Sequence, residues 1–466
     1  MRQWGRATWI FVLLLLALAS YKLWQVSLTR QLEQELQRLQ KLGEPTKIED
    51  LLPTVTPRRD GTLFYQLAIA QLDMAKRQLS YPVWDSVYQF IASEPTRPYK
   101  LADVQRTLQA SQLALQTFRK ALSFPHMRMT DWSVENPMSV MFPHFPKFRE
   151  FARLLAAEGK WRKQKGDIDS AVESHMTILK LVRRMGDEPS LVTGFLVQGT
   201  IYKIAYGGLQ QVLSDADASP QTYRSLMAEL NSWDIDRDLV RAIQSERVIV
   251  ITICKWMREK VSRKMLHKLS VGEQPFRVNL AVSLKPKDAL IIQNGLRTLE
   301  HQNAIIAIAR KGAPYDWEAI KQLEERWKRE VDQPVKRVNL SGVELMWEEN
   351  AIAKILTPIF SSIFQKAATY HAMQRIVQTM AALRLYRYER GHYPETLQEL
   401  VPKFLPSTPI DPFDGKPMRY KRLQRGFKIW SVGRDMKDHD GSVRGKWHGA
   451  YGLDWAEGDI IWVIKK

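Results

Sequence analysis

The chain has 466 residues, of which 45% are hydrophobic and 26% charged, so it holds enough apolar material for a sizeable core. This balance excludes disorder along the whole chain, and the length allows about two or three domains of ordinary size. The formal net charge is +19, from 69 Lys and Arg against 50 Asp and Glu. Such an excess favours contact with anionic lipid or an acidic polymer; the alternative is a surface that only aids solubility, and we expect no nucleic acid.

The first feature in chain order is an apolar run over residues 7–24, interrupted only by Thr8, Ser20, Tyr21 and Lys22. At about 1.5 Å per helical residue the run spans the hydrocarbon core of a bilayer. Arg2 and Arg6 precede it, which favours a cytoplasmic N-terminus. We therefore expect an uncleaved anchor over residues 1–27, in a single-pass protein of the cell inner membrane whose bulk is periplasmic or otherwise extracytoplasmic.

A cleavable signal peptide is the alternative, because Ala17-Leu18-Ala19 resembles a cleavage site. Apolar and aromatic residues continue beyond this site, and a polar helical pattern follows without a break, which favours the anchor. With either an anchor or a cleaved signal peptide, we expect the rest of the chain to be exported from the cytoplasm.

Residues 28–60 are predicted to form an amphipathic stalk and a linker. Leucines at helical spacing define one face of the stalk: Leu32, Leu36, Leu39 and Leu42. Glycine and proline residues punctuate the chain after Gly43 and indicate the linker.

A helical domain is expected over residues 61–235, with a Pro-rich aromatic loop at 124–146. Within it, the Gly166-Asp167 turn between two apolar helical patterns resembles tetratricopeptide-type helical hairpins, or TPR. An irregular helical domain is the alternative, because three clean repeats are not found. Gly194 and Gly199 lie in an apolar helical run, and we interpret them as permitting close helix packing rather than phosphate binding.

A basic helical and mixed region is expected over residues 236–366. Its first helix is predicted to run from Asp236 to about Lys268 and to end in the basic stretch 255–264. Cys254 is the only cysteine of the chain, which excludes an internal disulfide. It lies in an apolar part of this helix and is predicted to be a buried core residue.

An α+β module is predicted over residues 367–466. A long helix should end at Gly391, with Pro394 preventing its continuation, and a short helix follows at 395–400. Three short strands are expected, at 418–421, 427–432 and 459–464. The fold class predicted for the whole chain is therefore mainly α, with a small antiparallel sheet at the C-terminus.

Several motifs occur in order within this module: Tyr386, Gly391-His392-Tyr393-Pro394, Leu397, Leu400, Asp411-Pro412-Phe413, Gly415-Lys416-Pro417, Tyr420 and Ser431-Val432-Gly433-Arg434-Asp435. The order resembles the periplasmic domain of major pseudopilins of type II secretion. It is closer still to the pseudopilin-like C-terminal module of large envelope proteins from planctomycete-like bacteria, which also carry a helical middle and an N-terminal anchor. The N-terminal segment lacks a pseudopilin's processing site and embedded glutamate, which argues against incorporation into a filament by the usual route.

An acidic loop follows the second predicted strand and places Asp435, Asp438 and Asp440 on one turn. Clustered carboxylates in a flexible loop suit calcium, and the resemblance implies the same, because major pseudopilins hold calcium in the corresponding loop. The spacing is not that of an EF-hand, and basic residues lie among the acids, so a solvated turn is the alternative. A transition-metal site that adds His439 and His448 is less favoured.

The sequence contains no recognised catalytic motif, and we expect no enzymatic activity. The expected function is that of a membrane-anchored extracytoplasmic interaction or scaffold protein of the bacterial cell envelope, with protein partners there. One alternative is an adaptor of a type II secretion or pilus-like assembly. The other is an envelope hydrolase with a site in the 124–146 loop, where Asp131, Glu135 and His144 are the candidate residues.

Overall fold

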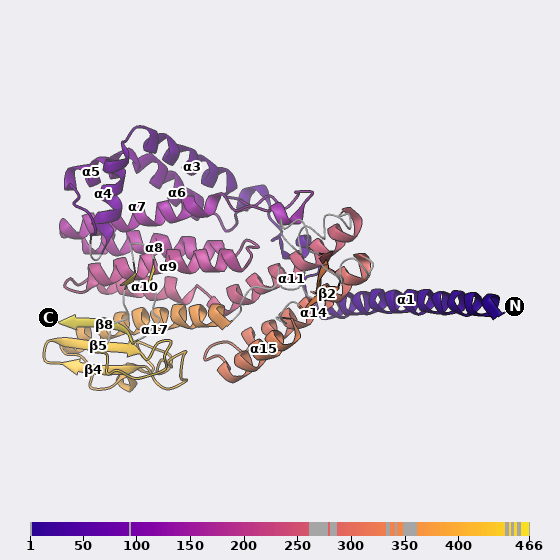
Figure 1. Ribbon diagram of the computed structural model, residues 1–466. Coiled ribbons are helices and arrows are strands. Elements are labelled where there is room, and N and C mark those ends of the chain that lie inside the picture. The colour runs from indigo at the N-terminus through magenta and orange to yellow at the C-terminus, as the bar shows by residue number, and fades with distance from the viewer. Residues whose placement is uncertain are drawn as a thin grey trace.

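The computed structural model describes residues 2–92, 95–260, 278–279, 287–331, 336–340, 343–347, 361–442, 447–448, 452–453 and 458–465. A helical body carries a three-stranded antiparallel sheet near the C-terminus, and one long helix, α1, projects from the opposite side (Figure 1). The predicted fold class is confirmed at this level.

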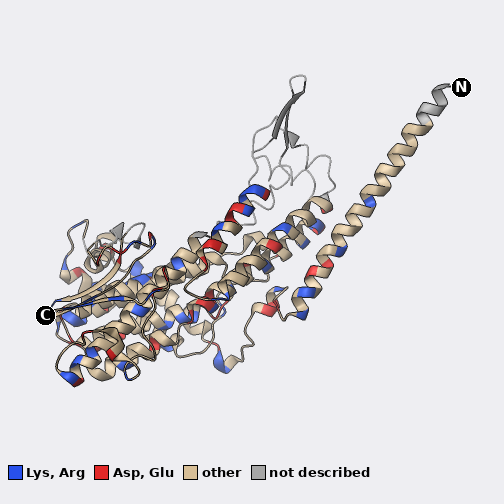
Figure 2. Cartoon of the chain, turned by 90° about the horizontal axis from the view of Figure 1, so that it is seen from below, with Lys and Arg blue, Asp and Glu red and all other residues tan. Residues whose placement is uncertain are grey.

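Helix α1 runs unbroken from Arg2 to Lys41 and is long and apolar enough to span a membrane. Its apolar part is bare, with Trp9 70% and Leu23 71% exposed, whereas Leu28 and Leu39 further along are buried against the body. The predicted stalk stripe is wrong at one position: Leu42 follows the end of the helix and is 64% exposed. Charged side chains gather on the part of α1 that joins the body, whereas the coloured part of the helix before it is almost entirely tan (Figure 2).

The body begins with layered helices, as Figure 1 shows. Their bounds are α2 (Ile48–Leu51), η1 (Pro57–Arg59), α3 (Thr62–Arg77), α4 (Tyr81–Ile91), α5 (Leu101–Ala110), α6 (Gln112–Leu122), η2 (Pro137–Ser139), α7 (His144–Gln164), α8 (Ile168–Met185), α9 (Val192–Leu213) and α10 (Pro220–Asn231). The predicted turn joins α7 to α8: Gly166 adopts a φ of +79°, and the Asp167 side chain caps α8 by accepting from the Ser170 N–H. Similarity to TPR hairpins stays a prediction.

Glycines allow these helices to approach closely, as predicted for Gly199. A Cβ at Gly199 of α9 would lie 1.8 Å from Cζ of Tyr370, and one at Gly208 would lie 2.0 Å from Cε1 of His175. The aromatic rings therefore occupy space that any side chain at these glycines would need.

Two long helices connect the body to α1. Helix α11 (Ile235–Lys260) and helix α14 (Lys287–Ala309) pack side by side, and α14 also packs along the stalk part of α1. Asp236 lies beside Gly312 and Cys254 beside Gly295, so α11 and α14 run antiparallel. Cys254 is buried as predicted. The predicted continuation of α11 over residues 261–268 lies outside the described residues.

Beyond α14 come α15 (Trp317–Glu330) and a small sheet in which β3 (Val343–Trp347) pairs with β1 (Val278–Asn279) and β2 (Lys336–Leu340). The C-terminal part contains α17 (Ser361–Arg390), η3 (Leu397–Leu400), β4 (Arg419–Leu423), β5 (Gly426–Ser431), the short pair β6 (Trp447–His448) and β7 (Gly452–Leu453), and β8 (Ile460–Lys465). The sheet order is β4-β5-β8, with Phe427 opposite Ile464 and Ile429 opposite Trp462. Gly391 ends α17 at a φ of +78°, as predicted.

Helix α17 belongs to the helical body as much as to the sheet. One continuous core extends from α3 to β8, and α17 contributes to it along its whole length. The Gln374 amide donates to the Leu230 and Trp233 carbonyls, and the Arg384 guanidinium donates to the Leu213 carbonyl. The sheet packs on one side of α17, and α9 and α10 cover another, so the predicted boundary near residue 367 falls inside a shared core.

Candidate functional site

The acidic loop lies beside the three-stranded sheet, and protein donors already bind its carboxylates. Asp435 Oδ2 accepts from His439 Nε2 at 3.0 Å and from the Gly458 N–H at 3.1 Å. Asp438 Oδ1 accepts from Trp430 Nε1 at 2.9 Å, and its Oδ2 lies 3.3 Å from Arg419 Nε.

The same loop meets basic side chains of the sheet. Asp440 has a φ of +56°, and its backbone carbonyl accepts from Lys428 Nζ. Partial burial raises the pKa of Asp438, but the hydrogen bonds it accepts outweigh burial and lower that pKa overall. The carboxylates of Asp435 and Asp438 are therefore already bonded to N–H donors of the protein, and Asp438 also to the arginine.

A calcium ion here would have to replace several of these donors. Among the described residues no group of three or more His, Cys, Asp or Glu side chains is arranged to hold a metal. The geometry does not match a preformed site, and calcium binding by Asp435, Asp438 and Asp440 stays a prediction. His439 is bonded to Asp435, whereas the side chain of His448 and residues 454–457 lie outside the described part of the chain.

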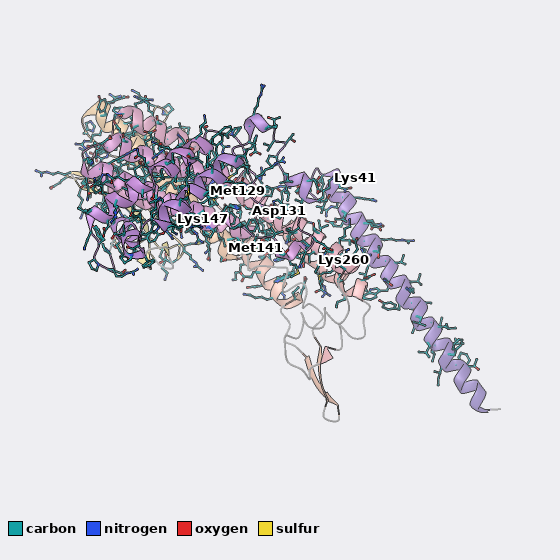
Figure 3. The ribbon with its side chains drawn as sticks, turned by 90° about the horizontal axis from the view of Figure 1, so that it is seen from above. Lys41, Met129, Asp131, Met141, Lys147 and Lys260 are labelled. Carbon is teal, nitrogen blue, oxygen red and sulfur yellow. The ribbon has the colours of Figure 1, made fainter. Side chains whose placement is uncertain are left out.

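The 124–146 loop does not assemble its three candidate residues into one site. Asp131 turns back on its own loop and accepts from the Ser133 N–H and hydroxyl. Glu135 is exposed and lies 3.7 Å from Lys260 Nζ at the end of α11. His144 is buried at the start of α7, where its ring packs on Phe142 and Phe148. Figure 3 shows Asp131 and Met141 on the side of the body toward α1, with Lys260 nearer to that helix.

His144 instead faces a glutamate that the sequence did not single out. Glu188 is buried; its Oε1 accepts from the Met129 and Thr130 N–H groups at 2.8 and 2.6 Å, and its Oε2 lies 3.9 Å from His144 Nε2. Burial raises the pKa of Glu188 to about 7 against these hydrogen bonds, and burial lowers the pKa of His144 to about 4. Glu188 anchors the loop to the body through the bonds that it accepts from Met129 and Thr130, and both Glu188 and His144 are shielded from solvent.

A second buried network joins α1 to the body. Glu44, just after α1, accepts from Arg247 Nη2 of α11 at 2.6 Å and from Gln244 Nε2 at 3.0 Å, and it also pairs with Arg310. Arg247 is only 1% exposed, so this is an ion pair removed from water. Asn303 of α14 extends the network, since its amide oxygen accepts from Arg247 Nη1 and its amide nitrogen donates to Glu35 of α1, both at 2.8 Å.

Sequence reasoning missed this junction because each of its residues has an ordinary surface context. Glu44 stands between Gly43 and Pro45, a pattern typical of an exposed turn, and Arg247 stands in a helical pattern with charged neighbours. The one available signal is that Arg247 lies just before the apolar run 248–254, on a helix that must be largely buried.

The predicted basic end of α11 is described only as far as Lys260. Lys255 and Lys260 are exposed there, and the remainder of the stretch, to Lys264, lies outside the described residues. Anionic lipid or polymer contact through this stretch stays a prediction.

With the geometry established, we compared the chain with models of known protein families, with curated proteins and with solved structures, and none of the three comparisons gave a match.

Proposed function

We propose that this chain is a membrane-anchored interaction or scaffold protein of the bacterial cell envelope, with α1 as its single inner-membrane span and the body outside the cytoplasm. The observation that carries the proposal is the continuity of α1. One helix contains the bare apolar run and the buried Leu28 and Leu39. The body is therefore attached to the span by a packed rod rather than by a flexible tether.

Retention of the span, rather than its cleavage, is supported by what lies after Ala19. Cleavage there would leave Leu23 and Val26 exposed at 71% and 46% on a new N-terminal end. These residues suit lipid far better than water, and Tyr21 and Trp24, whose rings meet edge to face, suit the bilayer interface.

The edge strand β4 is the surface we propose for a protein partner. Among the described strands β4 pairs only with β5, so its outer edge offers backbone donors and acceptors. Lys421 and Arg422 on this strand are exposed. Arg422 already pairs with Glu395, so an extended acidic segment that adds to the sheet would satisfy the backbone groups and the charge of Lys421.

An adaptor of a secretion or pilus-like assembly is the second candidate, and the packing of the motif residues favours it. Tyr386 donates to Glu399 at 2.9 Å, and Tyr420 donates to the Pro394 carbonyl at 2.8 Å. Among the residues that carry the pseudopilin resemblance, Tyr420 thus contacts Pro394, and the Ser431 hydroxyl donates to Asp411 Oδ1 at 2.8 Å. Because α9 and α10 cover α17, such an adaptor would meet its partners through the sheet or its loops.

Crosslinking in intact cells, followed by purification from membranes, tests both candidates. We expect specific envelope proteins to co-purify with the wild-type chain and to be lost with Lys421→Glu, but not with the exposed control Lys416→Glu. Secretion components among them would select the adaptor. An unchanged set of partners in Lys421→Glu would contradict the proposed surface.

A further inference from the structure

Helix α3 carries apolar side chains on two opposite faces. The residues of its inner face are buried in the body: Tyr65, Ala68, Leu72 and Ala75. On its outer face Leu63 is 78%, Leu67 49% and Met74 55% exposed, and the exposed Ala70 lies between them. A surface helix ordinarily has polar residues opposite its buried stripe, whereas a helix that is apolar all round is covered on both faces. The outer stripe of α3 therefore suits a contact with another molecule.

The spacing within this outer stripe indicates the shape that covers it. Leu63, Leu67, Ala70 and Met74 follow one another at intervals of four, three and four residues, which is the spacing of the a and d positions of a coiled coil. The stripe is about 16 Å long, and the small Ala70 near its middle allows a partner backbone to approach closely. Such a stripe fits the apolar face of a second helix laid along it.

The two ends of the stripe are basic. Arg58 lies just before α3, Arg77 is its last residue, and both are exposed. Neither arginine forms an ion pair with another residue of the described ranges. The carboxylates of the same helix region already have partners, because Asp73 pairs with Lys147 and Asp60 accepts from the Thr62 N–H at 2.9 Å. The positive charge at the ends is therefore available to a partner with acidic residues.

A second copy of this chain fits the stripe poorly. Two α3 helices laid along each other's stripes always bring their basic ends together. In a parallel pair each arginine meets its own counterpart, and in an antiparallel pair Arg58 meets Arg77. Both arrangements place like charges side by side, which is unfavourable.

The position of α3 argues against the membrane as the other molecule. Figure 1 shows α3 in the part of the body beyond the end of α1 that joins the body, away from the apolar run. In Figure 3, Lys147, which pairs with Asp73 of α3, likewise lies farther than Lys41 from the N-terminal end of α1. A bilayer around the apolar run does not reach this surface.

We propose that the outer face of α3 docks an amphipathic helix of another protein, whose apolar side chains meet Leu63, Leu67 and Met74 and whose acidic side chains meet Arg58 and Arg77. The inference deepens the proposed function and rests on it only in assuming that the body binds proteins. Figure 1 shows α3 and β4 on opposite sides of the body, so this surface is separate from the edge strand. It also does not require α1 to cross a membrane.

Two exposed leucines provide matched variants. Leu67 lies in the stripe and is 49% exposed, whereas Leu101, at the start of α5, lies outside it and is 47% exposed. The full-length protein, Leu67→Gln and Leu101→Gln would be reconstituted in phosphatidylcholine nanodiscs. Each would be titrated against a fluorescent helical peptide of about 20 residues, with leucine at its a and d positions and glutamate beside them. A second peptide has lysine in place of every glutamate.

We expect the wild type and Leu101→Gln to bind the glutamate peptide equally. Leu67→Gln should bind it about tenfold more weakly, because a leucine that the peptide would bury is replaced by a polar amide. Arg77→Gln should weaken the binding and reduce its salt dependence, whereas Arg106→Gln, an exposed control on α5, should change neither. If Leu67→Gln fails to fold, Leu63→Gln supplies the same comparison.

Equal binding by Leu67→Gln and Leu101→Gln would overturn the surface, and equal binding of the lysine peptide would overturn the acidic partner. A dimer in sedimentation that Leu67→Gln dissociates would assign the stripe to a second copy. Binding to phosphatidylglycerol vesicles that Leu67→Gln abolishes would assign it to a membrane, and either result would overturn the helical partner. Failure of α1 to insert into nanodiscs would contradict the anchor instead, and the same titration would then be made with the soluble protein.

Discussion

Arg247 and Glu44 form a buried ion pair, 2.6 Å between Nη2 and Oε2, that ties the end of α1 to the middle of α11. Breaking a buried pair leaves one charge without compensation, which costs about 3–5 kcal/mol. We therefore expect Glu44→Gln to lower the free energy of unfolding by about 3 kcal/mol, measured by denaturant titration in detergent. The exposed Glu49→Gln is the control, and equal stability of the two variants would contradict a junction fixed by this pair.

The pH dependence of the same pair has a definite sign. Burial raises the pKa of Glu44, but hydrogen bonds from Arg247 and Arg310 outweigh burial and lower the pKa overall. A lowered folded-state pKa contributes stability above the ordinary value of 4.5, and that stability is lost as the pH falls through the folded-state pKa. Glu44→Gln should therefore show a weaker loss of stability below about pH 4.5 than the wild type.

The stability contributed by Glu188 should depend on pH in the opposite direction. Its folded-state pKa, raised by burial to about 7, lies above the ordinary 4.5, so its contribution is complete below pH 4.5 and is lost as the pH rises through 7. As the pH rises from 4.5 to 7, the free energy of unfolding of Glu188→Gln should therefore rise by about 3 kcal/mol relative to that of the wild type, at about 1.36 kcal/mol per pKa unit. Thermal melts across pH, with the exposed Glu173→Gln as control, measure the difference; parallel curves for Glu188→Gln and the wild type would exclude it.

Gly199 tests the docking of α17 on α9. A Cβ there would lie 1.8 Å from the Tyr370 ring, so Gly199→Ala should destabilise the chain by about 1–3 kcal/mol through overpacking. In the Tyr370→Leu background the same substitution should cost less, because the ring no longer occupies the space. Equal costs in both backgrounds, measured as a double-mutant cycle, would show that the two residues do not meet.

Calcium binding by the acidic loop can be tested in the full-length protein. If Asp435, Asp438 and Asp440 bind the ion, calcium at about a hundred times its Kd adds about 2.7 kcal/mol and raises the Tm. EDTA should reverse the shift, and Asp438→Ala with Asp440→Ala should remove it. No shift in the wild type would leave the loop as a turn held by Trp430, Arg419 and Lys428.

Local patterns in the sequence predicted the elements well where a single residue type decides the backbone. Gly391 ends α17, the Gly166-Asp167 turn joins α7 to α8, and the three C-terminal strands lie within about two residues of their predicted bounds. Contacts between distant segments were not predictable. Nothing local marks Glu44 as the partner of Arg247, because their pairing depends on how α1 and α11 come together. Helix α17 likewise packs against the sheet on one side and against α9 and α10 on another. The single stripe of apolar residues recognised in its sequence did not reveal the second contact.

Topology is the most direct test of the central claim that α1 anchors the chain and that the body lies outside the cytoplasm. Single cysteines would be placed by Gln3→Cys, before the apolar run, and by Gln66→Cys, at an exposed position of α3, with the buried Cys254 replaced by alanine. Spheroplasts would be treated with a membrane-impermeant maleimide, and their membranes would be washed with carbonate. We predict that both proteins stay in the washed membranes, that Gln66→Cys is labelled in intact spheroplasts, and that Gln3→Cys is labelled only after lysis. Release of the body as a shortened soluble protein, or labelling of Gln3→Cys alone before lysis, would contradict the account.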